Sequence, residues 1–479
     1  MSRLGRNTIQ LTFAMVGQKA LAFFYFLMLA RMIGAESTGA YFLALSITTM
    51  FSVLTDFGLQ PVLIREVAKE REDWQALVRN TLSLKTIFVI ISCALVIGFV
   101  RFMGYDPLVR SLVYVALGVM ALDAVSLTMF GLLRGRQILF YESIGMFAGQ
   151  FITVVFGVAV LLLQAPIVWL IAALLFGSLF NAVFSSAMVA KHAHGEKLFC
   201  MAWSWPFVRR LLKTALPFAL AGIFVKIYSY VDTLAISYFF GSEDVGIYAV
   251  AYKLTYAFQF LPLAFVAALY PAFSDLVQRG DSELSRIFRQ AMFYMMFLAT
   301  PIVFGIWAVA EPLIAISVGS EFSASAPILS TLVFVLLFIF LDFPIGSLLN
   351  AADRQTLKTT LMGLTMVINV IANFILIPRM GALGAAIAAN ISFAFLFFSG
   401  LIFVPQFVKI SWKRFFWKLL RIFLAGLLMG LLIRFASGTL TLFFTIPLGV
   451  FTYLVLLVVF GTLDRQDVCK LYAKFASHH

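Results

Sequence analysis

The sequence predicts an all-α protein that crosses a membrane many times. Of its 479 residues, 62% are hydrophobic and only 12% are charged, whereas soluble domains are nearer half apolar and a quarter charged. Its mean hydropathy is +1.01. Apolar stretches of about 20 or more residues, long enough to cross a bilayer as helices, recur along the whole chain.

We expect about fourteen such spans. The first follows the short segment M-S-R-L-G-R-N and is too long for the core of a signal peptide, so we interpret it as a retained helix. The expected spans cover residues 8–33, 39–60, 80–101, 108–133, 142–164, 166–190, 213–240, 245–272, 290–310, 325–351, 356–378, 381–404, 416–434 and 440–463.

The distribution of Lys and Arg supports this layout. With the N-terminus in the cytoplasm, 26 of the 35 basic residues fall in inside segments, five fall in outside segments and four lie within spans. Basic residues accumulate on the cytoplasmic side of membrane proteins. The bias predicts cytoplasmic termini, and it explains the net charge of +13 without a nucleic-acid partner.

A repeated motif indicates an internal duplication. The pattern G-x-E-x-x-G-x-Y occurs at Gly34–Tyr41 and again at Gly241–Tyr248. The same offset aligns Lys19 with Lys226, and it places Tyr25 opposite Asp232. Later, Asp123 and Asp342 are each followed by similar tails, G-L-L-R-G-R-Q and S-L-L-N-A-A-D-R-Q.

The duplication predicts two six-helix lobes followed by an additional helix pair. An even helix number lets both lobes enter from the same side, so a pseudo-two-fold axis would run along the membrane normal, with the substrate site between the lobes. The predicted divisions are an N-lobe at 1–190, a cytoplasmic linker at 191–212, a C-lobe at 213–404, and helices 13 and 14 with a cytoplasmic tail at 405–479.

Charged residues at membrane depth are the strongest functional candidates, because such charges are costly and usually face a cavity. The deep ones are Lys19, Lys226, Lys253, Asp123, Asp232 and Asp342. Structural ion pairs between helices remain an alternative for each. Lys226 and Asp232 are six residues apart on one helix, so we expect them to address different partners. Lys85 lies near a span boundary, where we expect its side chain to snorkel toward water.

Other classes of site find little support. His192 and His194 lie in the polar linker, and two histidines are too few for a stable metal site. The three cysteines show no metal spacing or disulfide framework. No Gly-Lys-Ser/Thr phosphate loop is present, which argues against direct use of ATP.

Several motifs together resemble the polysaccharide flippases of the Wzx type, within the multidrug/oligosaccharidyl-lipid/polysaccharide exporter superfamily. The motifs are L-A-R-M-I-G-A-E-S-T-G-A-Y, D-F-G-L at Asp56–Leu59, Y-V-D-T-L at Tyr230–Leu234, G-S-E-D-V-G-I-Y, and N-x-x-x-N-x-x-L-I-P-x-x-G-x-x-G-A-A-x-A at Asn369–Ala388. They are scattered over residues 30–390, and each is weak alone.

The resemblance implies a V-shaped pair of lobes around a cationic cavity and export of a lipid-linked oligosaccharide, with a polyprenyl pyrophosphate carrier, from the cytoplasmic to the outer leaflet. Alternating access would be coupled to a gradient of H⁺ or Na⁺, with no cofactor. The substrate-binding candidates are Lys19, Lys226, Lys253, Arg31 and Tyr230. The ion-coupling candidates are Asp232, Asp342 and Asp123, with a lysine as the expected neighbour of Asp232.

The implied setting is the cell membrane, where the protein would be a monomer working beside a polysaccharide polymerase and glycosyltransferases. One alternative is a lipid II or multidrug exporter of the same superfamily, although the cavity of a drug exporter would need a less positively charged lining. A different class is an integral-membrane glycosyltransferase. Such an enzyme would need a cluster of acidic or His residues at a water-facing loop, which the short outer loops lack.

Overall fold

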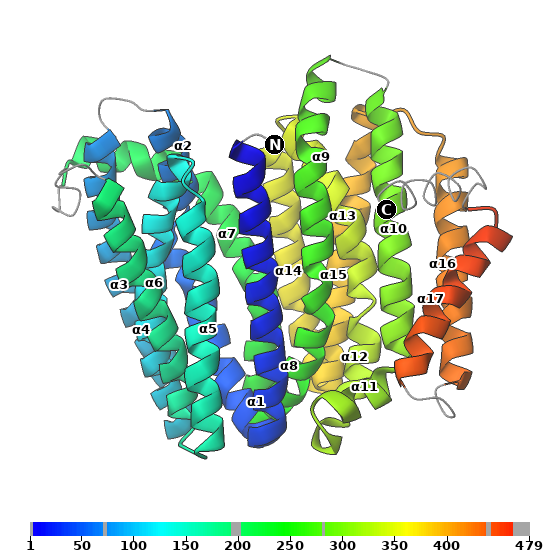
Figure 1. Ribbon diagram of the computed structural model, residues 1–479, viewed down its shortest axis with the longest axis horizontal. Coiled ribbons are helices and arrows are strands. Elements are labelled where there is room, and N and C mark those ends of the chain that lie inside the picture. Colours follow the sequence, from blue (N-terminus) through cyan, green and yellow to red (C-terminus); the bar gives the residue numbers. More distant parts are fainter. Residues whose placement is uncertain (1–2, 70–73, 193–202, 280–282, 437–441, 463–479) are drawn as a thin grey trace. The chain divides into compact units, whose positions relative to one another are not determined.

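The computed structural model describes residues 3–69, 74–192, 203–279, 283–436 and 442–462. This part of the chain is helical and contains no strand (Figure 1). Residues 193–202 of the predicted linker at 191–212, and the whole of the tail after 462, lie outside the described residues. The longer helices are α1 (Arg3–Asp56), α3 (Trp74–Phe102), α4 (Pro107–Gly135), α5 (Phe140–Leu162), α6 (Val168–His192), α7 (Trp205–Phe240), α10 (Glu283–Ala308), α14 (Gln355–Met380), α15 (Ala382–Phe403) and α16 (Trp412–Ala436).

Shorter helices complete the fold. They are α2 (Leu59–Ala68), α8 (Ser242–Tyr256), α9 (Phe260–Arg279), α11 (Ala310–Ser317), α12 (Ser325–Leu332), α13 (Val335–Ala351) and α17 (Leu442–Val459), with 3₁₀ turns η1 (Ala257–Gln259), η2 (Ser320–Phe322) and η3 (Val404–Gln406).

The prediction of a polytopic α-helical membrane protein is confirmed. Among the described residues, 11 helical stretches are long and apolar enough to cross a membrane. Three expected spans are not separate members of this set. The span at 39–60 continues α1 beyond Gly34, where the backbone leaves helical geometry at φ 77° and ψ 176°. The span at 245–272 is interrupted by the 3₁₀ turn η1. The last span, at 440–463, corresponds to a helix that is too short to be in this set. The number fourteen therefore stays a prediction.

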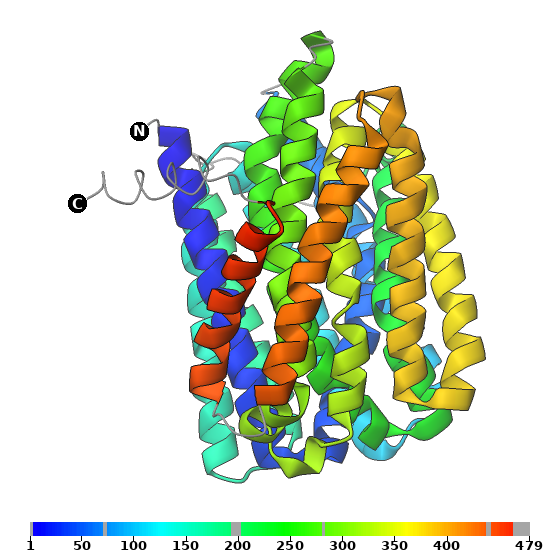
Figure 2. The same ribbon diagram turned by 90° about the vertical axis from the view of Figure 1, so that its right-hand side faces the viewer.

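The chain forms two compact units. The first comprises residues 1–250 and 362–382, and the second comprises 251–361 and 383–479. In the first, α6 packs on α4 and α5, while α1 packs on α4, α5 and α7. In the second, α10 packs on α13 and α16, and α17 lies along α16 (Figure 2). These units follow packing rather than sequence repeats, and the predicted division into six-helix lobes stays a prediction.

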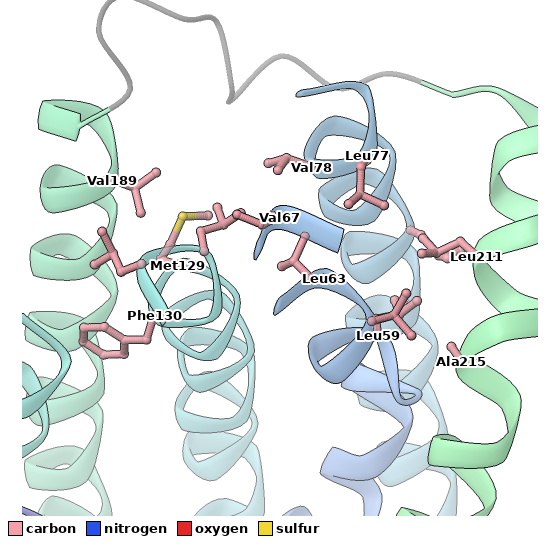
Figure 3. Packing of buried hydrophobic residues seen from close by; sticks show 14 of the residues in the cluster. Leu59, Leu63, Val67, Leu77, Val78, Met129, Phe130, Val189, Leu211 and Ala215 are labelled. Atoms are coloured by element: carbon pink, nitrogen blue, oxygen red, sulfur yellow. The ribbon is translucent and has the colours of Figure 1, made fainter. Parts of the chain in front are cut away.

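An apolar cluster holds one end of the first unit together. Buried residues of α2, α3, α4, α6 and α7 meet there, and Figure 3 shows Leu63 and Val67 of α2 beside Met129 of α4. The short helix α2 is anchored to α7 at Gly58 (φ 70°), where an added Cβ would lie 2.6 Å from the carbonyl oxygen of Ala215. This packing fixes the bend between α1 and α2.

The backbone supports the duplication seen in the sequence. Gly34 and Gly241, at equivalent places in the repeated motif, both have positive φ (77° and 92°) in an otherwise extended conformation. The later tails also form the same turn. Gln137 and Asp353 adopt φ 60° and 56°, and the backbone hydrogen bonds around them match one by one.

The matched turns also correct one correspondence. They align Leu132-Leu133 with Leu348-Leu349, which places Asp342 opposite Ser126. Asp123 and Asp342 are therefore not equivalent positions of the repeat, and each must be assessed separately.

Candidate functional site

The two copies of the repeated motif, Gly34–Tyr41 and Gly241–Tyr248, are called corners below because each joins two helices. The two corners pack against each other within the first unit. A Cβ atom added to Gly39 would overlap the carbonyl oxygen of Ser242, and one added to Gly246 would overlap the carbonyl oxygen of Ala35. Such reciprocal overlap means that backbone lies directly on backbone, which only glycine permits. The second glycine of each motif thus serves the contact between the two corners.

Asp232 is buried next to this contact. Its side chain lies on α7, the residue is 5% exposed, and Oδ2 accepts a short hydrogen bond from the hydroxyl of Tyr248, the last residue of the second corner. Oδ1 accepts from the backbone N–H of Thr233 at 2.7 Å and faces the Thr233 hydroxyl at 3.4 Å. The prediction of a lysine next to Asp232 is wrong. Hydroxyl and amide donors surround this carboxylate, and it forms no ion pair within the described residues.

Lys226 and Asp232 have different partners, as their spacing predicted. The Lys226 ammonium lies 5.6 Å from the centre of the Tyr230 ring, one turn further along α7. Lys226 is half-buried and forms no ion pair with any described residue. An aromatic face attracts a cation without neutralising it. Lys226 therefore presents positive charge at membrane depth and could receive an anionic group.

The residues of the first copy that align with Lys226 and Asp232, Lys19 and Tyr25, have different surroundings from their counterparts. Lys19 is exposed on α1, as is Arg31, three residues before Gly34. Tyr25, which occupies the position equivalent to Asp232, is buried, and its hydroxyl has no hydrogen-bond partner in the part of the chain described. That hydroxyl packs where Gly157 of α5 leaves room for it. The repeat thus places a carboxylate in one half and a phenol in the other.

A buried ion pair was missed by the sequence reasoning. Lys85 does not snorkel: its side chain is 5% exposed, and its ammonium lies 2.5 Å from Oδ1 of Asp56. Oδ2 of Asp56 accepts from the backbone N–H of Gln60 at 3.3 Å, in the first turn of α2. The separation of 29 residues hid this pair. Because Asp56 ends α1 at a tightly packed bend and Lys85 is buried on α3, we interpret it as a structural pair.

The other two acidic candidates lie apart from Asp232. Asp123 is exposed on α4, with Ser178 of α6 within hydrogen-bonding reach. Asp342 belongs to the second unit and lies on α13, facing Gly400 of α15, where an added Cβ would lie 3.7 Å from Oδ1 of Asp342. Lys358 supplies the positive charge acting on Asp342, and its ammonium lies over Gly346, one turn along α13. The sequence reasoning did not single out Lys358, whose ammonium packs against Gly346.

The remaining polar candidates are Lys253 and the pair Asn369 and Asn373. Lys253 is half-buried in the last turn of α8, in the second unit. Asn369 and Asn373 of α14 are both buried, and the amide of Asn373 donates to Oδ1 of Asn369 at 3.0 Å. Among the described residues, no three His, Cys, Asp or Glu side chains gather as they would around a metal ion.

The sequence matches known families. A family model described as "Polysaccharide biosynthesis protein" matches residues 4–277, more than half of the chain. A second model, MatE, matches residues 217–375.

Two relatives from Haloferax volcanii carry flippase names. The chain is 23% identical over 420 residues to the "Probable low-salt glycan biosynthesis flippase Agl15", covering 86% of this chain and 85% of the relative. It is 30% identical over 169 residues to the "Probable flippase AglR", covering 34% of this chain and 35% of the relative.

Solved structures share the fold. The lipid II flippase MurJ in an inward closed conformation aligns with a TM-score of 0.77 at 16% identity, over 94% of this chain and 98% of MurJ. An inward-facing multidrug resistance MATE transporter aligns with a TM-score of 0.68 at 17% identity, over 85% of this chain and 99% of the transporter. At these identities the likeness establishes the fold alone.

Proposed function

The chain belongs to the polysaccharide biosynthesis protein family, and from this premise we propose that it is a flippase that carries a lipid-linked oligosaccharide from the cytoplasmic to the outer leaflet. The name of Agl15, a probable glycan biosynthesis flippase, supports this substrate class, and the name of AglR supports the assignment to a flippase. The assignment is to a transporter and not to an enzyme, because the family and its flippase relatives move molecules across membranes. Its setting would be the cell membrane, with both termini cytoplasmic.

The observation that carries the proposal is that Lys226 has no counter-charge among the described residues. This cation lies on a membrane helix against the Tyr230 ring, without an ion-pair partner among the described residues. An uncompensated charge at this depth is costly unless a ligand or water meets it. A phosphate or pyrophosphate linking a sugar to its lipid would supply the counter-charge, and Tyr230 would offer an aromatic face to a sugar. Lys19, Arg31 and Lys253 are further candidates for the same role.

An apolar cavity offers room for a lipid chain. In the second unit, a cavity of 380 Å³ lies among α10, α16 and α17. Pro301, Gly305, Met429, Ile433 and Gly449 contribute to its apolar lining. A hydrocarbon chain loses no hydrogen bonds on entering such a space. The cavity is thus compatible with an amphiphilic substrate.

We further propose that Asp232 couples transport to an ion gradient of H⁺ or Na⁺, without a cofactor. Its carboxylate is buried between α7 and the corner that begins α8, and Tyr248 ties its charge to the geometry of that corner. A movement of the corner would change the donors around the carboxylate and hence its affinity for a cation. Asp342 and Asp123 remain secondary candidates for ion coupling.

The test is a charge-removing double variant. Lys19→Gln with Lys226→Gln should abolish export of the glycan in cells, while the protein still inserts into the membrane, because the anionic group loses its counter-charges. The matched control is Lys191→Gln with Lys213→Gln, which removes the same charge from exposed positions near the end of α6 and the beginning of α7. Normal glycan export in the Lys19/Lys226 double variant would reject the assignment of these lysines to substrate binding.

Export of lipid II or of drugs is the competing function on the same fold. The MurJ alignment does not favour it, since 16% identity shows only the fold. Vesicles containing the purified protein would separate the two functions. Movement of a polyprenyl-pyrophosphate oligosaccharide is expected, but movement of neither lipid II nor a cationic drug.

A further inference from the structure

The start of α16 carries a group of cations that the proposed transport function does not use. We call Lys409, Lys413, Arg414, Lys418 and Arg421 the α16 collar. All five lie within 13 residues, and the chain contains no Asp or Glu between Val404 and Leu463. The collar therefore has no acidic neighbour along its own segment.

Aromatic rings, not carboxylates, hold the inner cations of the collar. The Lys418 ammonium lies 4.1 Å from the centre of the Phe293 ring of α10. The Arg421 guanidinium lies 5.4 Å from the centre of the Trp417 ring and donates to the carbonyl of Phe460 at 3.2 Å. These contacts position the side chains and leave their positive charge in place.

The outer cations are free to meet a ligand. Lys413 and Arg414 are exposed and make neither a hydrogen bond nor an ion pair with any side chain in the described part of the chain. The backbone N–H of Lys409 donates to the Ser285 hydroxyl at 3.0 Å, which joins the collar to the first turn of α10. The carboxylate there, Glu283, already pairs with Arg286, so α10 does not neutralise the collar.

The collar lies at the polar end of a lipid-facing helix. Trp417 is 56% exposed and Phe416 is 44% exposed. Exposed apolar side chains continue down the same helix at Leu420, Leu424, Leu428, Leu432 and Phe435. Trp and other amphipathic rings settle at the level of lipid headgroups. The collar cations therefore stand at headgroup depth on a surface that faces lipid.

We propose that the α16 collar binds the phosphate of an anionic phospholipid in the leaflet that borders this end of the helix. Lys413 and Arg414 contact the phosphate, and Lys418, held over the Phe293 ring, adds positive charge beside it. The exposed Trp417 ring packs on the upper part of the acyl chains. Zwitterionic lipids bind more weakly, because their own ammonium group competes with the collar. This role is separate from the transported substrate and holds whether or not the proposed flippase function does.

The experiment titrates phosphatidylglycerol or phosphatidylcholine into the full-length, delipidated protein and counts bound lipids by native mass spectrometry. The variant is Lys413→Gln with Arg414→Gln. Each cation near an anionic surface contributes roughly fivefold to binding, so phosphatidylglycerol should bind at least about tenfold more weakly to this variant. Binding of phosphatidylcholine should not change.

The matched control is Arg209→Gln with Arg210→Gln, an exposed adjacent pair at the start of α7. It should retain phosphatidylglycerol binding within about twofold, since it lies outside the collar. Equal weakening in both double variants would show general charge attraction and overturn the proposal, as would no weakening in either. A third arm adds inorganic phosphate at millimolar concentration: failure to displace the lipid supports a lipid site, and complete displacement would overturn it in favour of a simple anion site.

Discussion

The two copies of the repeated segment share a backbone but differ in one buried side chain. In both copies a glycine with positive φ ends a helix, and a second glycine five residues later packs on the opposite corner. Sixteen residues apart, the first copy has Tyr25 and Tyr41, whereas the second has Asp232 and Tyr248. The two copies thus share the backbone of the corner, whereas the buried residue sixteen positions before its tyrosine differs between them.

The two buried side chains, Tyr25 and Asp232, differ in how their polar atoms are hydrogen-bonded. Tyr25 keeps a hydroxyl that has no partner among the described residues, while Asp232 holds a carboxylate satisfied by Tyr248 and Thr233. A buried carboxylate is worth its cost only where the charge is used or well paired. We therefore expect the shared glycines to serve architecture in both halves, and Asp232 to serve a task of the second half alone.

The largest effect should come from breaking what the copies share. Gly39→Ala and Gly246→Ala each force a methyl group into a backbone carbonyl, which cannot move aside as a side chain can. Each should cost about 3 kcal/mol of stability, at the upper end for overpacking, measured as thermal unfolding in detergent. Gly98→Ala on α3 is the control, because a Cβ there meets open space. A normal melting temperature for either corner variant would contradict the packing of the two corners.

An intermediate effect should come from the carboxylate that the copies do not share. Asp232→Asn preserves shape but removes the charge, so an imposed H⁺ or Na⁺ gradient should no longer accelerate transport. Coupling between two sites typically amounts to about 5- to 150-fold, and that stimulation should disappear in vesicles loaded with the glycolipid. The protein should still fold. Full stimulation by the gradient in this variant would remove Asp232 from ion coupling.

The smallest effect should come from single hydroxyl groups. Tyr248→Phe removes a donor to a buried carboxylate, and a hydrogen bond to a charged group contributes about 1.5–3 kcal/mol. Tyr25→Phe removes a hydroxyl without a partner and should leave stability unchanged or slightly higher. The pair can be compared by thermal unfolding at constant pH and salt. Equal losses in both variants would mean that the two halves treat their buried hydroxyls alike.

Much of the site was accessible from the sequence, and the exceptions have a common cause. The spacing of Lys226 and Asp232 correctly indicated separate partners. The ion pair of Lys85 with Asp56 was missed, and a lysine was wrongly expected at Asp232, because hydropathy marks how deep a residue lies but not which helix faces it. Lys358 was overlooked for the same reason, since its place depends on Gly346 of another helix.

The sequence by itself determined the membrane-spanning helical class, the repeated corner and the position of the deep charges. A bilayer imposes the length and hydropathy of each span locally, and a glycine with positive φ acts within one turn. Only the tertiary structure decided that the two corners interlock and that Tyr248 meets Asp232. Contacts between helices depend on which faces pack together, and the apolar composition of a membrane helix leaves several faces nearly equivalent.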